Sequence, residues 1–134
     1  MNLARFVLIV TGLSFVGYGL LCLLQPAGMP AQFTGYDLST PVPMVEAIAM
    51  YGGLQTGLGV FFIWAAVQRD FVVPALWCIV LMMGALAATR GWAMSVHGMV
   101  GMHPRVIVFE ATTTLLALVA VLRLRRASAF DAFA

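Results

Sequence analysis

The chain has 134 residues, of which 63% are hydrophobic and 9% are charged. Soluble domains are about 45 to 50% apolar and about 25% charged, so this composition predicts an integral membrane protein, with a single domain over residues 1–134. The formal net charge of +2 is too small to indicate nucleic-acid binding, and all seven basic residues are arginine.

Four apolar segments follow one another, each long enough to cross the roughly 30 Å hydrocarbon layer as a helix. They cover residues 3–24, 43–67, 71–94 and 106–122. The predicted fold class is all-α, an integral membrane antiparallel four-helix bundle. The first segment is longer than the apolar core of a signal peptide and is interpreted as a retained anchor. The alternative, three spans and an interfacial first helix, would require a charged helix face that this segment lacks.

The distribution of arginines predicts the orientation. With four spans, both termini and a tight turn at residues 68–70 lie on one side, which carries five of the seven arginines. Cytoplasmic segments are enriched in basic residues, so we expect a bacterial inner-membrane protein with both termini in the cytoplasm. The long link of residues 25–42 and the histidine-containing loop of residues 95–105 would then face the periplasm.

Three charged residues are expected at one depth below the periplasmic surface. Glu46 lies about one turn inside the second segment, Arg90 about one turn before the end of the third, and Glu110 about one turn inside the fourth. Unpaired charges are costly in hydrocarbon, whereas a guanidinium can donate two hydrogen bonds to a carboxylate. We therefore predict a network of these three residues. It is either a staple between helices or the floor of a ligand pocket that also includes Tyr51 and Trp92.

The second segment carries glycines suited to close helix packing. Gly53 and Gly57 have the small-xxx-small spacing of membrane helix contacts. At α-helical spacing they share a face with Glu46 and Met50. Gln55 falls on the opposite side of the helix from Glu46, and we expect its partner to lie on the first segment.

The 95–105 loop contains soft potential metal ligands. His97, His103, Met99 and Met102 are donors of the kind that hold copper(I) or zinc. Two histidines without cysteine or carboxylate partners form no recognised site, however, so no metal is predicted.

The cysteines and carboxylates give little support for catalysis. Cys22 and Cys78 lie at different depths of their segments, too far apart for a disulfide, and form no CxxC pattern. No nucleophile or cofactor motif accompanies the carboxylates, so no cofactor is expected. An enzymatic role such as proton transfer on a membrane-soluble substrate is the least supported hypothesis.

The residues of the second, third and fourth segments also carry a family resemblance. The chain resembles small bacterial four-helix DoxX-like inner-membrane proteins, near an uncharacterised domain-of-unknown-function branch. The matching features are Glu46, Gly52, Gly53, Gly57 and Gly59, the end of the third segment with Arg90, Gly91 and Trp92, and Glu110. The resemblance implies a small inner-membrane protein, in some cases tied to thiol, sulfur or quinone redox partners, and no catalytic residues.

Two functions remain open from the sequence. The first is a non-enzymatic accessory or partner subunit that contacts the lipid bilayer and docks on another membrane protein or a second copy of the chain. The alternative is a binding or transport module for a small polar ligand, a lipid headgroup or a quinone that enters from the periplasmic leaflet. A pocket lined by the polar residues would favour the second, whereas a dry, packed network would argue against it.

Overall fold

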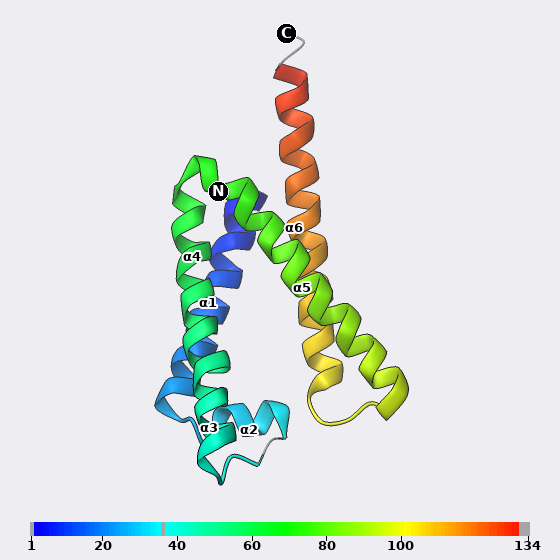
Figure 1. Ribbon diagram of the computed structural model, residues 1–134. Helices are drawn as coiled ribbons and strands as arrows, with labels where there is room; N and C mark the ends of the chain where they lie inside the picture. Colours follow the sequence, from blue (N-terminus) through cyan, green and yellow to red (C-terminus); the bar gives the residue numbers. More distant parts are fainter. Residues whose placement is uncertain (1, 36, 132–134) are drawn as a thin grey trace.

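The computed structural model describes residues 2–35 and 37–131, and the regular structure in these residues is helical. The elements are α1 (Leu3–Leu24), α2 (Met29–Thr34), α3 (Pro41–Ala47), the π-helix η1 (Ile48–Leu54), α4 (Gln55–Val67), α5 (Arg69–His97) and α6 (His103–Asp131) (Figure 1). α3, η1 and α4 continue into one another, and we call them together the composite helix, Pro41–Val67.

Four helices in the described part of the chain are long and apolar enough to cross a membrane. They are α1, the composite helix, α5, and α6 as far as Arg126. The predicted all-α class is confirmed, and the chain is a candidate multi-pass membrane protein.

The connections between these helices are shorter than the sequence indicated. Gln68, with an extended backbone, alone separates α4 from α5, because α5 begins directly after it. α5 continues to His97 and ends at Gly98, whose φ of 87° lies in the left-handed region that favours glycine. The 25–42 link contains the short helix α2, which ends in the same way at Gly35, with a φ of 72°.

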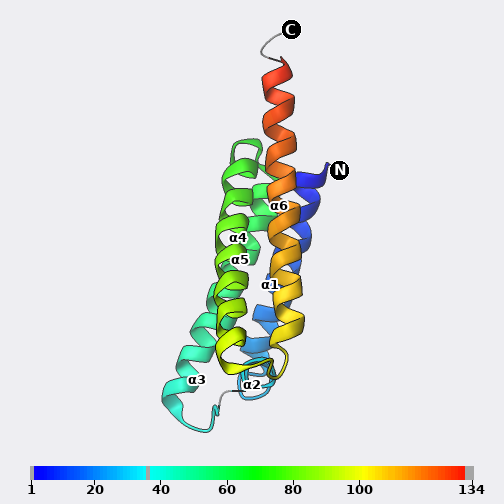
Figure 2. The same cartoon turned by 90° about the vertical axis from the view of Figure 1, so that its right-hand side faces the viewer.

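Successive long helices run in opposite directions and form two hairpins (Figures 1 and 2). α1 packs along the composite helix in the first hairpin, and α5 packs along α6 in the second. The hairpins lie close together where α4 passes into α5, and they diverge toward the end that carries α2 and α3 (Figure 1). This divergence decides which side chains of the two hairpins can meet.

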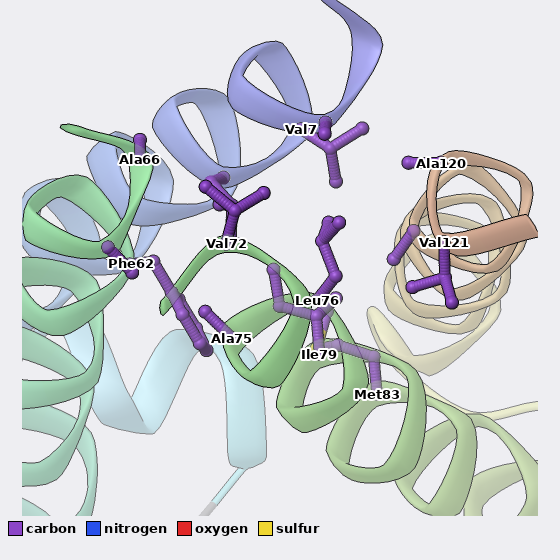
Figure 3. Close-up of a cluster of buried hydrophobic side chains, with 14 of the residues drawn as sticks. Val7, Phe62, Ala66, Val72, Ala75, Leu76, Ile79, Met83, Ala120 and Val121 are labelled. Atoms are coloured by element: carbon purple, nitrogen blue, oxygen red, sulfur yellow. The ribbon is translucent and has the colours of Figure 1, made fainter. Parts of the chain in front are cut away.

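Buried apolar side chains join the two hairpins near the end where α4 passes into α5 (Figure 3). Leu8 of α1, Phe62 of α4, Leu76 and Ile79 of α5, and Val121 of α6 have 0% of their surface exposed. Each of the four long helices therefore contributes to one core, which holds the hairpins together at this end.

Glycines set the close approach of α1 to α4. A Cβ atom placed on Gly59 would lie 2.6 Å from the carbonyl oxygen of Gly12 and 2.6 Å from the backbone nitrogen of Val16. No side chain fits at this position without separating the helices, so glycine is required there.

Gly53 and Gly57, the glycines expected to pack helices, do not do so within the chain. Both are exposed, and a Cβ on either would meet no described atom within 4 Å. They lie on another side of the composite helix than Gly52 and Gly59, which are seven residues apart on one helix face and pack against α1. The positions that face α1 are therefore corrected to Gly52, Thr56 and Gly59.

Candidate functional site

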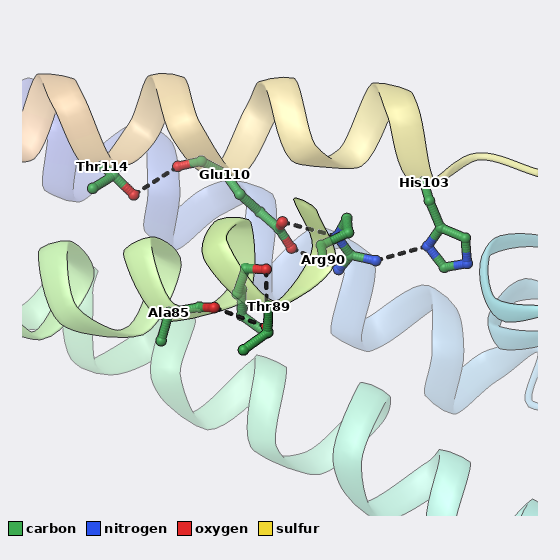
Figure 4. A network of polar contacts seen from close by, with 7 residues as sticks. Ala85, Thr89, Arg90, His103, Glu110 and Thr114 are labelled. Carbon is green, nitrogen blue, oxygen red and sulfur yellow. Dashed lines mark hydrogen bonds and ion pairs between the residues drawn. The ribbon is translucent and has the colours of Figure 1, made fainter. Parts of the chain in front are cut away.

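An ion pair connects α5 to α6 (Figure 4). Arg90 donates from Nε to Oε2 of Glu110 at 2.8 Å and from Nη2 to Oε1 at 2.7 Å. The Glu110 side chain is 4% exposed and that of Arg90 is 23% exposed. Two parallel bonds from a planar guanidinium to a buried carboxylate form a strong, geometrically specific contact. The pairing of these two residues, expected from their depth, is present in the structure.

The third member of this network is His103, the first residue of α6. Nη1 of Arg90 donates to Nδ1 of His103 at 2.7 Å (Figure 4). A guanidinium can only donate, so Nδ1 is the acceptor and the ring is neutral, with its proton on Nε2. From the sequence, His103 was only a weak candidate for a metal ligand, and its hydrogen bond with Arg90 was not predicted. Its spacing of seven residues from Glu110, two helical turns on one face, was the available signal.

Glu46 lies outside this network. It is exposed on α3 and makes no hydrogen bond or ion pair with the residues that the structure describes. The predicted network of Glu46, Arg90 and Glu110 is therefore corrected to Arg90, Glu110 and His103. Equal depth did not produce contact, because α3 lies where the hairpins diverge (Figure 1).

A half-open cavity of about 630 Å³ lies between the composite helix and α5. α3, η1 and α4 form one wall, α5 forms the other, and Phe15 of α1 also contributes. Most lining side chains are apolar, and the polar ones are Glu46, Tyr51, Gln55 and Thr89. The hydroxyl of Thr89 donates to the carbonyl oxygen of Ala85 at 2.8 Å. The volume is in the range of small-molecule sites, about 300 to 1,000 Å³.

The structure divides the predicted pocket residues between two places. Tyr51 lines the cavity together with Glu46 and interacts electrostatically with Arg90, which in turn binds Glu110 between α5 and α6. Trp92 is 69% exposed on α5 and is not one of the cavity-lining residues. The predicted single site is thus an ion pair within one hairpin and a neighbouring cavity between the hairpins.

Gln55 faces the same cavity as Glu46, which corrects its expected position on the opposite side of the helix. Glu46, Met50, Leu54 and Leu58 also line the cavity, at intervals of four residues. In a regular α-helix, three such steps at about 100° per residue would rotate the set by about 120°. The π-helix slows this rotation, so the set stays on one side.

Aromatic contacts hold Tyr51 at the edge of the cavity. Its ring centroid lies 6.5 Å from that of Tyr18 on α1, and Tyr18 lies 5.3 Å from Phe33 on α2. Both pairs are edge-to-face, a favourable geometry for aromatic rings. The short helix α2 thereby supports the position of η1.

The potential metal ligands of the 95–105 loop are separated in the structure. His103 binds Arg90, and the sulfur of Met102 accepts a hydrogen bond from Nη1 of Arg105 at 3.8 Å. Met99 is 81% exposed, and His97 is exposed at the end of α5. In the described residues, no group of three or more histidine, cysteine or acidic side chains could hold a metal ion. The two cysteines are free thiols.

These features define an all-helical protein with four candidate membrane-spanning helices, an ion pair within one hairpin and a cavity between two hairpins. Residues 3–121 match the family described as "Domain of unknown function (DUF4345)", and the chain belongs to this family. No curated protein and no solved structure matches the chain. An uncharacterised family agrees with the branch expected from the sequence, and the resemblance to DoxX-like proteins stays a prediction.

Proposed function

We propose that the protein is a non-enzymatic binding module of the bacterial inner membrane that holds an amphipathic molecule between its two hairpins. The observation that carries this proposal is the cavity of about 630 Å³ with apolar walls and a few polar groups. Ligand sites in proteins have this combination of volume and lining. A π-helix forms part of the wall, and such helices are frequent at functional sites.

The proposed membrane arrangement is an antiparallel four-helix bundle with both termini in the cytoplasm. The excess of arginines near the termini and at the start of α5 supports this orientation. The cavity is then in the periplasmic half of the membrane, because α3 and η1 precede α4 on the way to the cytoplasmic turn. The ligand would enter from the periplasmic leaflet.

The ion pair has a different role in this proposal. Glu110 uses both carboxylate oxygens, and Arg90 uses Nε and both terminal nitrogens, within α5 and α6. These groups are therefore partnered within the second hairpin without a ligand. We assign it as a staple of the second hairpin, which leaves the cavity as the binding site.

A cavity-filling variant tests the proposal. Ala85 of α5 is exposed and lines the cavity, and Ala88 is exposed one turn away without lining it. We expect Ala85→Phe to reduce the amount of co-purified lipid or quinone in native mass spectrometry of gently extracted protein, and Ala88→Phe to leave it unchanged. Equal ligand retention in both variants and the wild type would overturn the proposal.

A second candidate function, the accessory or partner subunit, is favoured by the exposed face of the composite helix. Gly53 and Gly57 leave open space on this face, with small-xxx-small spacing. In this proposal, a helix of another membrane protein or of a second copy packs there. We expect Gly53→Leu with Gly57→Leu to lower association measured by cross-linking in membranes. Gly17→Leu is the control, because Gly17 is also exposed with no described atom near its Cβ position. Unchanged cross-linking in the double variant would show that this face is not the docking surface.

A further inference from the structure

We infer that the cavity selects an amphipathic molecule with a primary ammonium head, which Glu46 binds, and a flexible apolar body. This inference rests on the proposed binding function and specifies the chemistry of its ligand. It comes from the charges, hydrogen bonds and shape of the lining.

The charge of the cavity is negative and uncompensated. Glu46 is the charged residue of the lining, and it makes no ion pair with the residues that the structure describes. A carboxylate at the periplasmic end of a membrane helix can bind a cationic or hydrogen-bonding partner. A cationic head group supplies that partner.

Arg90 does not compensate for Glu46, although it follows the lining residue Thr89 in sequence. Its guanidinium is directed toward α6, where Glu110 and His103 bind it (Figure 4). Arg90 is thus bound by Glu110 and His103 and not by Glu46. An anionic head group, such as a phosphate or a fatty-acid carboxylate, would be repelled by the Glu46 carboxylate.

The hydrogen-bonding chemistry of Glu46 also favours a donor. The Glu46 carboxylate accepts only, whereas the side-chain amide of Gln55 on the same wall offers an acceptor and donors. Gln55, like Glu46, has no side-chain partner in the described part of the chain. A primary ammonium has three donors, which suit the Glu46 carboxylate.

The apolar walls accept a flexible body. Met50 and Leu54 of η1, Leu58 of α4, and Met82 and Leu86 of α5 line the cavity. Methionine side chains adapt to irregular shapes, and leucines provide apolar area without polar requirements. An alkyl chain or a similarly flexible hydrocarbon suits these walls.

A series of ligands with one chain and different heads tests the inference on the wild-type protein. In nanodiscs of phosphatidylcholine, we expect dodecylamine to bind about tenfold more tightly than dodecanol, as a charge-assisted hydrogen bond implies. Dodecanoate should bind more weakly than the alcohol. Binding is measured by competition with a fluorescent dodecylamine derivative.

Two variants locate the selectivity. Glu46→Gln should reduce dodecylamine binding about tenfold and leave dodecanol unchanged, so that the preference for the amine disappears. Asp70→Asn is the matched control, because Asp70 is an exposed carboxylate at the start of α5, away from the cavity. It removes the same charge and should preserve the preference.

The outcomes separate this inference from the proposed function. If the three ligands bind equally and Ala85→Phe abolishes their binding, the cavity is a binding site without ammonium selectivity; the inference is then wrong and the proposed function holds. If no ligand binds, both the inference and the proposed function are wrong. If Glu46→Gln fails to fold, the head-group series on the wild type still tests the selectivity.

Nanodiscs that contain phosphatidylethanolamine identify the source of the amine. Displacement of dodecylamine indicates a lipid amine, and unchanged binding indicates a free amine.

Discussion

Two glutamates in the periplasmic half of the proposed bundle have opposite surroundings. Glu110 is buried and receives two hydrogen bonds from Arg90, whereas Glu46 is exposed and has no described partner. Removing one member of a buried pair leaves the other charge unsatisfied, which is more costly than losing the attraction itself. The two residues should therefore respond differently to the same substitution.

We expect Glu110→Gln to lower the free energy of unfolding by about 2 to 4 kcal/mol in mild detergent. Glu46→Gln, the matched control, should change it by less than about 0.5 kcal/mol in ligand-free protein. Thermal or denaturant unfolding followed by circular dichroism measures both. Equal losses would show that the carboxylates share one network. Replacing Arg90 and Glu110 together by methionine should recover part of the loss.

His103 should exist as the neutral tautomer with its proton on Nε2, because Nδ1 accepts from Arg90 at 2.7 Å. The ¹⁵N chemical shifts of selectively labelled histidine distinguish the two ring nitrogens. We expect His103→Leu to lower the free energy of unfolding by about 1 to 2 kcal/mol, since one guanidinium donor loses its acceptor. A protonated Nδ1 in the folded protein would contradict the assignment.

At the scale of single elements, the composite helix has three faces with different surroundings. Gly52, Thr56 and Gly59 face α1, and Glu46 and Gln55 face the cavity, while the glycines between them face outward. The π-helix makes this division possible, because it changes the rotation of the helix partway along its length.

A pair of glycine substitutions tests these faces. We expect Gly59→Ala to lower the free energy of unfolding by about 1 to 3 kcal/mol, because the new Cβ would lie 2.6 Å from the carbonyl oxygen of Gly12. Gly57→Ala meets open space and should be neutral or stabilising by up to about 1 kcal/mol, from the higher helix propensity of alanine. Unfolding measurements on both variants decide, and a reversed order would mean that the helix faces are assigned incorrectly.

At the scale of the whole molecule, the hairpins are held together at one end and diverge at the other (Figure 1). Leu76 is fully buried in the core where the two hairpins meet, whereas Leu81 on the same helix is 68% exposed. We therefore expect the core to set the angle between the hairpins, and with it the width of the cavity.

We expect Leu76→Ala to lower the free energy of unfolding by about 2 to 5 kcal/mol, through lost packing and a new internal void. Leu81→Ala should cost less than about 1 kcal/mol, because its side chain would face lipid. Distances between spin labels on the two hairpins should broaden only in Leu76→Ala. Equal distance distributions in both variants would show that the core does not control the divergence.

The sequence by itself determined the all-α class, the four long apolar helices and the pairing of Arg90 with Glu110. The pairing could be predicted because only a short loop joins α5 to α6, which makes them antiparallel neighbours, so that equal depth brings side chains together. Only the tertiary structure decided that Glu46 stands apart, because the divergence of the hairpins is set by core packing far from it in sequence. The π-helix likewise escaped prediction. Periodicity arguments assume a constant rotation per residue, and the hydrogen bonds that change this rotation leave no distinct pattern of residue types.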